Sequence, residues 1–296
     1  MSESIPVILN PAARSTQAAA REKAIRALKP EPELILTTGP GEATEIAARL
    51  ANEGRPLIVA AGGDGTMNEV LQGICRVNAR RPANQKHSAL GVLPVGTMNV
   101  FALEIGLPSQ DIIACWARLT SGRMREIDLW MANEHYFVQL AGVGLDAEII
   151  QETPWERKKR LGPLSYVVSA LQVLGRTPPV LRVKVEGRPD LLGSVVLIGG
   201  GKHYGGPVKV FPQAKNQDGL LDLLVFRQLG GWEFAQMVRA LLESGYDTAL
   251  DLDYLQVREF TVVGEPEAPY ELDGELVQDR TPVHFRPAPF MLNVAV

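Results

Sequence analysis

Short apolar runs alternate with helical patterns along the first 120 residues. Four runs have the length and the aliphatic content of buried strands: 7–9, 34–36, 57–61 and 90–93. Between and after them, apolar residues recur at helical spacing over 16–28, 42–51, 66–74, 98–104 and 110–120. Such alternation is typical of a parallel sheet with helices on both faces, and ligands of these sheets bind at the C-terminal strand ends. We therefore expect an α/β domain over residues 1–128.

The pattern changes after this point. Apolar segments now follow one another, separated by Gly and Pro clusters, at 128–131, 136–140, 180–185, 195–198, 221–226, 254–263 and 291–296. Helical patterns interrupt them at 163–174 and 232–242. Successive strands with turn residues between them predict a β-rich antiparallel sandwich over residues 129–296. The closing segment, 285–296, fits either domain.

Composition narrows the classes of partner and compartment. The formal net charge is −4, so the chain has no basic excess to neutralise a nucleic acid backbone, and we do not expect a nucleic acid partner. The two cysteines, Cys75 and Cys115, lie in apolar helical patterns, which indicates buried thiols in a reducing compartment. The N-terminus lacks a signal-peptide pattern, and no apolar run approaches the ~20 residues of a membrane-spanning helix. We expect a cytoplasmic protein, with peripheral attachment to the inner membrane face and homodimerisation left open.

A glycine loop with one carboxylate follows the third predicted strand. Its sequence is Gly62-Gly63-Asp64-Gly65-Thr66, and a helical pattern begins there. Glycines let the backbone approach an anion, and the N–H groups of a helix N-terminus point toward it. A carboxylate would repel a phosphate unless a divalent cation lies between them or the carboxylate serves as a base. The loop therefore predicts phosphoryl transfer rather than simple nucleotide binding.

A second loop follows the fourth predicted strand, with the sequence Pro94-Val95-Gly96-Thr97-Met98-Asn99. Gly96 permits close approach, and Thr97 can cap the helix or donate to a phosphate. Two such loops at one sheet edge can hold a triphosphate between them. Neither loop has the Gly-Lys-Ser/Thr of a Walker A motif or the Gly-x-Gly-x-x-Gly of a dinucleotide fold.

These motifs, in this order, resemble those of the diacylglycerol kinase catalytic family, which includes bacterial lipid kinases and sphingosine kinases. The further matching segments are Asn10-Pro11, Thr37 to Ala43, Gly142 to Asp146, Pro212-Gln213-Ala214 with Asp218-Gly219, and Asp273-Gly274-Glu275. The resemblance covers nearly the whole chain. It implies an NAD-kinase-like first domain, a β-rich second domain, and the use of ATP and Mg²⁺ to phosphorylate a lipid hydroxyl at a membrane surface.

The resemblance also implies roles for individual residues. The nucleotide would be bound by Asn10, Thr38, Gly62, Gly63, Gly65, Thr66, Glu69, Gly96, Thr97 and Asn99. The catalytic residues would be Asp64, Asp273 and Glu275, with either Asp64 or Glu275 as the general base. Metal would be held by Asp64 and Asp128, and at a separate structural site by Asp218 with the Leu220 carbonyl.

Structural alternatives exist for each carboxylate. Asp64 also fits a helix N-cap, and Asp273-Gly274 also fits a hairpin turn. Asp128 fits a surface carboxylate at the start of a strand, and Asp218-Gly219 fits an ordinary turn.

Three further segments bear on this interpretation. Val100 stands where many family members have an acidic residue, which removes one carboxylate from the expected metal network. The segment 155–168 joins a basic cluster to an apolar helical pattern, which fits a membrane-docking surface or a solvated loop before a core helix. The glycine-rich stretch 199–206 is expected to line the substrate cleft, with Lys202 near a headgroup or phosphate, or to form only a wide turn.

The sequence therefore favours an ATP-dependent lipid kinase acting on a diacylglycerol-like lipid, phosphatidylglycerol or a sphingoid base. One alternative is a kinase of NAD or another soluble metabolite, because the Gly-Gly-Asp-Gly-Thr motif is shared with NAD kinases. Another is a nucleotide or lipid binder without catalytic activity, which the valine at position 100 suggests.

Overall fold

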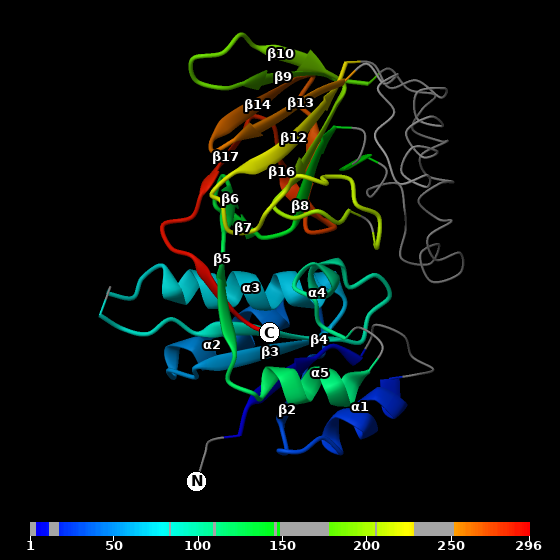
Figure 1. The fold of residues 1–296 in the computed structure, drawn as a ribbon, viewed down its shortest axis with the longest axis vertical. Helices are drawn as coiled ribbons and strands as arrows, with labels where there is room; N and C mark the ends of the chain where they lie inside the picture. Colours follow the sequence, from blue (N-terminus) through cyan, green and yellow to red (C-terminus); the bar gives the residue numbers. More distant parts are fainter. Residues whose placement is uncertain are drawn as a thin grey trace. The chain divides into compact units, whose positions relative to one another are not determined.

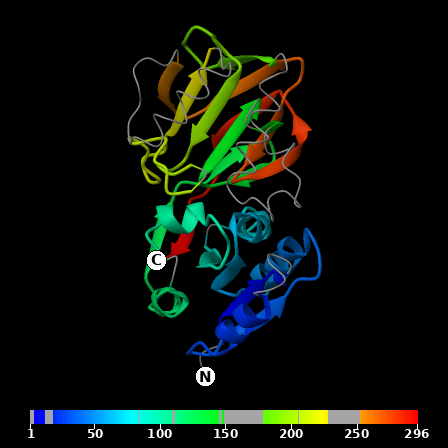
Figure 2. The same ribbon diagram turned by 90° about the vertical axis from the view of Figure 1, so that its right-hand side faces the viewer.

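The chain forms two compact units in a computed structural model (Figure 1, Figure 2). The structure describes residues 4–11, 18–82, 84–108, 111–144, 147–148, 178–204, 206–227 and 252–296. Unit 1 comprises Met1–Leu129 and Ala288–Val296, and unit 2 comprises Trp130–Pro287. The sequence predictions at 155–168, 163–174 and 232–242 lie outside the described residues.

Unit 1 contains a six-stranded sheet in the order β2-β1-β3-β4-β18-β5. The bounds are β1 Pro6–Leu9, β2 Glu33–Leu36, β3 Leu57–Gly62, β4 Ala89–Pro94, β5 Met124–Ile127 and β18 Leu292–Ala295. The first four strands are parallel, β18 is parallel to β4, and β5 is antiparallel to β18. Every residue of β3 and β4 is buried, as expected for central parallel strands covered on both faces.

Five described helices accompany this sheet: α1 Ala18–Arg26, α2 Glu42–Asn52, α3 Asp64–Asn78, α4 Val100–Glu104 and α5 Ile112–Leu119. Helices α2 and α3 pack closely because Gly73 lies between them. A Cβ at Gly73 would overlap the Thr44 carbonyl and Ala47 of α2. The N-cap of helix α5 is Asp111, whose side chain accepts hydrogen bonds from the backbone N–H groups of Ile113 and Ala114. The predicted α/β domain is confirmed.

Unit 2 contains two antiparallel six-stranded sheets, in the orders β10-β9-β14-β17-β6-β7 and β13-β12-β11-β8-β15-β16. The first sheet comprises β6 Trp130–Ala132, β7 His135–Phe137, β9 Val180–Lys184, β10 Leu191–Gly193, β14 Phe260–Glu265 and β17 Val283–Pro287. The second comprises β8 Leu140–Gly144, β11 Val195–Gly199, β12 Leu221–Phe226, β13 Leu252–Val257, β15 Pro269–Leu272 and β16 Glu275–Arg280. A shared core that includes Phe137, Tyr270 and Phe285 joins them. The predicted β-sandwich is confirmed.

Two predicted strands are each divided between the sheets of unit 2. The segment 254–263 ends β13 in one sheet and enters β14 in the other, with exposed Arg258 and Glu259 between them. The segment 136–140 is likewise divided between β7 and β8. An apolar pattern does not reveal such a change of sheet, because both parts of the segment face the same core.

The last strand, β18, lies in the sheet of unit 1, between β4 and β5. Strand β5 was not predicted, because its residues Met124 to Glu126 are polar or exposed and lie at the sheet edge. Among the described residues, no helix combines the length and apolarity that a membrane span requires.

Candidate functional site

Four loops of unit 1 meet at one edge of the parallel sheet. Asn10 follows β1, Thr38 follows β2, Gly63 follows β3 and Gly96 follows β4. These strands are consecutive neighbours in the order β2-β1-β3-β4, and all four run in the same direction. Their C-terminal ends therefore form the edge where parallel α/β sheets bind ligands. The structure brings together the segments that the sequence assigned to nucleotide binding.

The two glycine loops are in direct contact. The backbone N–H groups of Val95 and Gly96 donate to the carbonyl oxygen of Gly62, at 3.1 and 2.9 Å. A Cβ at Gly96 would overlap the backbone of Gly63, so this position requires glycine. Asn99 closes the second loop, since its Oδ1 accepts from Gly96 N at 3.1 Å and its Nδ2 donates to Gly96 O at 3.2 Å. Asn99 therefore has a structural role in this loop, at φ 50°.

Asp64 is the first residue of α3, and its carboxylate accepts backbone N–H groups at the start of the short helix α4. Burial raises the pKa of its carboxyl above the ordinary value, and hydrogen bonds from the backbone N–H groups of Phe101, Val100 and Asn99 oppose this rise. The Asp64 carboxylate thus connects the two glycine loops, because it accepts the first N–H groups of α4, the helix that follows the second loop. Val100, at the position where an acidic residue was expected from the resemblance, is 6% exposed and packs into the core.

Two residues that are expected to bind the nucleotide, Glu69 and Thr38, form hydrogen bonds within unit 1. The Oε2 atom of Glu69 accepts the backbone N–H of Ala43 at 3.2 Å, at the N-terminus of α2. The N–H and hydroxyl of Thr38 both donate to Oε2 of Glu42, at 2.6 and 2.8 Å, and these bonds lower the pKa of Glu42. Glu69 thus holds α2 against α3, and Thr38 is oriented by the first turn of α2.

The threonines of the two loops differ in exposure. Thr66 is buried at 7% exposure within α3, whereas Thr97 is exposed at the tip of the second loop. Thr97 is therefore the better placed of the two to meet a ligand from solvent.

Asp128 lies in the same sheet, toward the N-terminal ends of the parallel strands. It follows β5, whose last residue Ile127 pairs with Leu292, while Val294 of the parallel strand β18 pairs with Leu90 near the start of β4. Asp64 lies beyond the end of β3, which is level with the end of β4. At ~3.3 Å per residue the six residues of β4 alone span about 17 Å. This register places Asp128 toward the N-terminal ends of the parallel strands and Asp64 beyond their C-terminal ends, and a metal role shared by the two carboxylates stays a prediction.

The Asp273-Gly274 turn of unit 2 connects β15 to β16. Leu272 pairs with Glu275, and the two intervening residues have positive φ angles of 51° and 86°. This is the geometry of a two-residue hairpin turn. The Asp273 carboxylate is 3% exposed and accepts the backbone N–H groups of Val138, Gln139 and Leu140 at 2.8–3.1 Å. Both carboxylate oxygens of Asp273 are thus engaged inside unit 2, whereas Glu275 is exposed at the start of β16.

Asp218 forms an ordinary turn with Gly219. Its Oδ1 atom accepts the backbone N–H of Leu220 at 3.1 Å, and Gly219 has a φ of 71°. Asp222, four residues on, is fully buried, accepts the hydroxyl of Tyr254, and has a pKa raised by burial. These contacts account for Asp218 as a turn residue, and a metal site at Asp218 and the Leu220 carbonyl stays a prediction.

The described residues offer a Mg²⁺ ion a single-carboxylate site. In this part of the chain no three His, Cys, Asp or Glu side chains come together as a metal cage. Mg²⁺ in phosphoryl-transfer sites is commonly held by one or two carboxylates together with substrate phosphates and water. Asp64, partly exposed at the edge that carries both glycine loops, fits that description.

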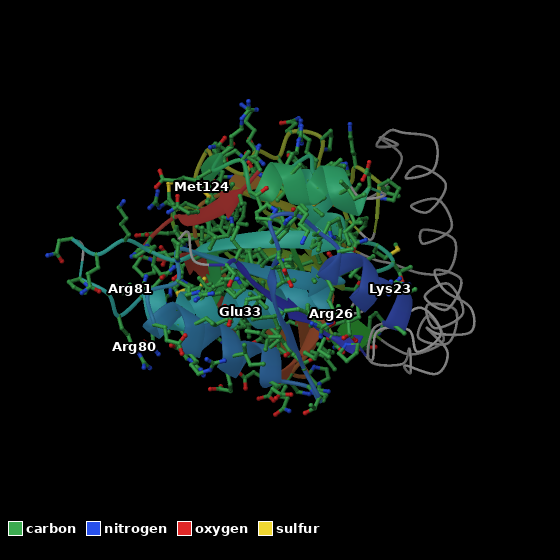
Figure 3. The ribbon with its side chains drawn as sticks, turned by 90° about the horizontal axis from the view of Figure 1, so that it is seen from below. Lys23, Arg26, Glu33, Arg80, Arg81 and Met124 are labelled. Carbon is green, nitrogen blue, oxygen red and sulfur yellow. The ribbon has the colours of Figure 1, made fainter. Side chains whose placement is uncertain are left out.

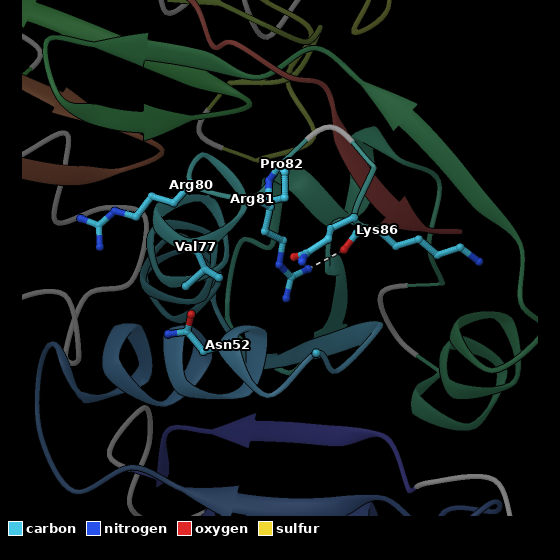
Figure 4. Close-up of a pocket in the computed structure, with 8 residues that line it drawn as sticks. Asn52, Val77, Arg80, Arg81, Pro82 and Lys86 are labelled. Carbon is cyan, nitrogen blue, oxygen red and sulfur yellow. Dashed lines mark hydrogen bonds between the residues drawn. The ribbon is translucent and has the colours of Figure 1, made fainter.

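One cavity of unit 1 lies away from this edge. It has a volume of 440 Å³ and is lined by Asn52, Gly54, Val77, Arg80, Arg81, Pro82, Gln85 and Lys86, at the C-terminal ends of α2 and α3 (Figure 4). Arg80 and Lys86 extend in different directions, while Arg81 donates to the carbonyls of Lys86 and Ala51 (Figure 4). Seen from below, Arg80 and Arg81 lie at one side of the unit and Lys23 at the other (Figure 3). Among these basic side chains, Arg81 caps the C-terminal end of α2 through the Ala51 carbonyl.

Two buried polar residues of unit 2 were not foreseen from the sequence. Glu271 is fully buried in β15, and its Oε2 accepts the backbone N–H of Gly274 at 2.7 Å. Gln139 is 2% exposed and donates from Nε2 to the carbonyl of His203 at 2.9 Å. The available signal was a charged residue inside an otherwise apolar strand, two positions before the Asp-Gly turn.

Two family models match the chain. A diacylglycerol kinase catalytic domain covers residues 4–132, and a YegS C-terminal NAD kinase beta sandwich-like domain covers residues 139–296. A diacylglycerol kinase of Bacillus subtilis is 31% identical over 242 residues, which is 81% of this chain and 77% of that protein. A probable YegS-like lipid kinase of Chromohalobacter salexigens is 30% identical over 79% of this chain and 74% of that protein.

Solved structures show the same fold. A putative diacylglycerol kinase of Bacillus anthracis superposes with a TM-score of 0.77 at 22% identity, covering 99% of this chain and 97% of that one. An NAD kinase of Archaeoglobus fulgidus in complex with ATP superposes with a TM-score of 0.52 at 12% identity, over 98% and 93% of the two chains. With both domains matched, the chain belongs to the family that joins a diacylglycerol kinase catalytic domain to a YegS C-terminal domain.

Proposed function

We propose that this protein is an ATP-dependent, Mg²⁺-dependent kinase that transfers the γ-phosphate of ATP to a lipid hydroxyl. The observation that carries the proposal is the meeting of the two glycine loops at the C-terminal edge of the parallel sheet, with Asp64 between them. The names of the relatives, diacylglycerol kinase and YegS-like lipid kinase, support a lipid acceptor.

Phosphoryl transfer depends mainly on positioning and on neutralising charge. The backbone N–H groups at the N-terminus of α3 are the ones that would bind and orient the triphosphate, because those of Val95 and Gly96 already donate to the Gly62 carbonyl. Asp64 would hold a Mg²⁺ ion at the sheet edge, and that ion would supply positive charge to the phosphates. Thr97, exposed at the loop tip, donates to a phosphate oxygen.

Glu275 is our candidate for the general base that accepts the proton of the lipid hydroxyl. It is exposed, and it directly follows a turn whose two residues are held by hydrogen bonds inside unit 2. Asp273 acts in this scheme as a positioning residue, because it is only 3% exposed and both of its carboxylate oxygens accept backbone N–H groups of unit 2.

The test is transfer of labelled γ-phosphate from ATP and Mg²⁺ to lipids in mixed micelles. The panel contains diacylglycerol, phosphatidylglycerol and a sphingoid base, with NAD alongside and Asp64→Asn as the inactive control. Label on a lipid that disappears in the variant supports the proposal and identifies the acceptor class. Label on NAD alone would indicate a metabolite kinase, and ATP binding without any labelled acceptor would indicate a non-catalytic binder.

A further inference from the structure

The turn that carries Glu275 is connected to the glycine-rich loop 199–206 by buried polar side chains. Within unit 2, the hydroxyl of Tyr204 donates to Oε1 of Glu271 at 3.3 Å. The other carboxylate oxygen of Glu271 accepts the backbone N–H of Gly274 at 2.7 Å. One buried carboxylate thus joins a loop residue to the backbone of the turn, 70 positions farther along the chain.

A second connection runs through Gln139. Its side chain donates to the carbonyl of His203, next to Tyr204, and its backbone N–H donates to Oδ1 of Asp273 at 2.8 Å. The loop backbone also returns to this segment, since Gly200 N donates to Gln139 O at 2.9 Å. The loop and the turn are therefore held together from two sides.

Burial makes this arrangement costly unless every partner is present. Glu271 is fully buried, and Gln139 and Asp273 are 2% and 3% exposed. A buried polar group that loses its partner pays its full desolvation cost, so such a network is rigid when it is complete. A two-residue hairpin turn alone needs only Asp-Gly or Asn-Gly, and does not require a buried carboxylate in the preceding strand.

We propose that Glu271 is a positioning residue, which couples Tyr204 of the glycine-rich loop to the Asp273-Gly274 turn and so fixes the place of Glu275. This inference rests on the proposed function of Glu275 as the base. Through this coupling, ligand binding at the glycine-rich loop would change the position of the turn. A ligand that moves Tyr204 also moves the backbone N–H of Gly274, one residue before Glu275. Removing the Tyr204 hydroxyl therefore loosens the turn without altering the base itself.

The test compares Tyr204→Phe, Glu271→Gln and the double variant. Tyr254→Phe is the matched control, because it removes the same group from another tyrosine that donates to a buried carboxylate, that of Asp222, on other strands of the same sheet. Tyr204→Phe is expected to lower kcat roughly tenfold with an unchanged KM for ATP, since misplacing a reacting group is costly. Tyr254→Phe is expected to lower the free energy of unfolding about as much as Tyr204→Phe does, while its kcat stays unchanged.

The double variant measures the coupling. If Glu271 connects Tyr204 to the turn, Tyr204→Phe has no further effect on kcat in the Glu271→Gln background. Additive effects on kcat, or equal kcat for Tyr204→Phe and Tyr254→Phe, would overturn the proposal.

Hydrogen exchange of the backbone amides separates this inference from the proposed function. Faster exchange in peptides that contain Gly274 is expected in Tyr204→Phe and not in Tyr254→Phe, whether or not the protein phosphorylates any acceptor. Unchanged exchange at Gly274 would refute the coupling. If exchange responds as expected and no acceptor is labelled by the unaltered protein, the coupling stands and the kinase proposal fails.

Discussion

At the scale of the residue, a carboxylate is informative only together with its partners. Asp64, Asp128, Asp218 and Asp273 were all candidates for catalysis or metal binding from the sequence. The structure places Asp273 against three backbone N–H groups and Asp218 in its own turn. Asp128 lies toward the N-terminal ends of the parallel strands, whereas Asp64 lies beyond their C-terminal ends. Asp64 alone combines partial exposure with a position between the two glycine loops.

The raised pKa of Asp64 gives a prediction about stability as well as activity. Because the folded state favours the protonated form, the ionised carboxylate destabilises the fold at neutral pH, and this cost disappears as the pH falls through the folded pKa. Asp64→Asn should therefore raise the free energy of unfolding at pH 7, while phosphate transfer falls roughly 10²–10³-fold. Urea unfolding at a series of pH values measures the first effect, whose gain should shrink toward about pH 4. A variant that is less stable at pH 7 would contradict the stability argument.

Glu69 provides a second prediction at this scale. Its carboxylate accepts the N–H of Ala43, so Glu69→Ala removes a partner from the N-terminus of α2 and should cost about 1 kcal/mol of unfolding free energy. ATP affinity, measured by calorimetry, should not change. Glu45→Ala is the control, because it breaks an exposed ion pair with Arg76 between the same helices and should cost less. Weaker ATP binding by Glu69→Ala at unchanged stability would instead indicate a nucleotide contact.

At the scale of the element, the sequence predicted the strands of unit 1 well and those of unit 2 less completely. Buried parallel strands such as β3 and β4 are continuous apolar runs, which can be read directly. The division of 254–263 between β13 and β14 is invisible in the pattern, because it depends on which neighbour each half pairs with. The roles of Glu271 and Gln139 are not predictable from the sequence for the same reason, since their hydrogen-bond partners are distant in the chain.

The contact between the glycine loops predicts that Gly96 cannot be replaced. In Gly96→Ala the new methyl group would overlap the backbone of Gly63, so the loops must separate, at a cost of about 1–3 kcal/mol. Loss of ATP binding should accompany this change, and thermal unfolding with calorimetry would measure both. Gly39→Ala is the matched control, because a Cβ there meets nothing within 4 Å. Equal stability of the two variants would show that the loops do not pack as described.

At the scale of the whole molecule, the chain leaves unit 1 after Leu129 and returns to it at Ala288. The last strand completes the sheet of unit 1 by pairing with both β4 and β5. Without β18, the edge of β4 would be unpaired and β5 would lose its neighbour. Unit 1 therefore depends on residues that follow the whole of unit 2 in the chain.

This dependence can be tested at Val294, which is fully buried in β18. Val294→Asp places an unpaired charge in the core of unit 1 and should destabilise that unit by about 3–5 kcal/mol, with loss of ATP binding. Asn293→Asp is the control on the neighbouring, partly exposed position; there the new charge faces Glu126 across the strands and should cost less than about 1 kcal/mol. Hydrogen exchange should show lost protection in β1, β3 and β4, with β8, β11 and β12 still protected, because each unit has its own core. Equal loss of protection in both units would show instead that they unfold as one.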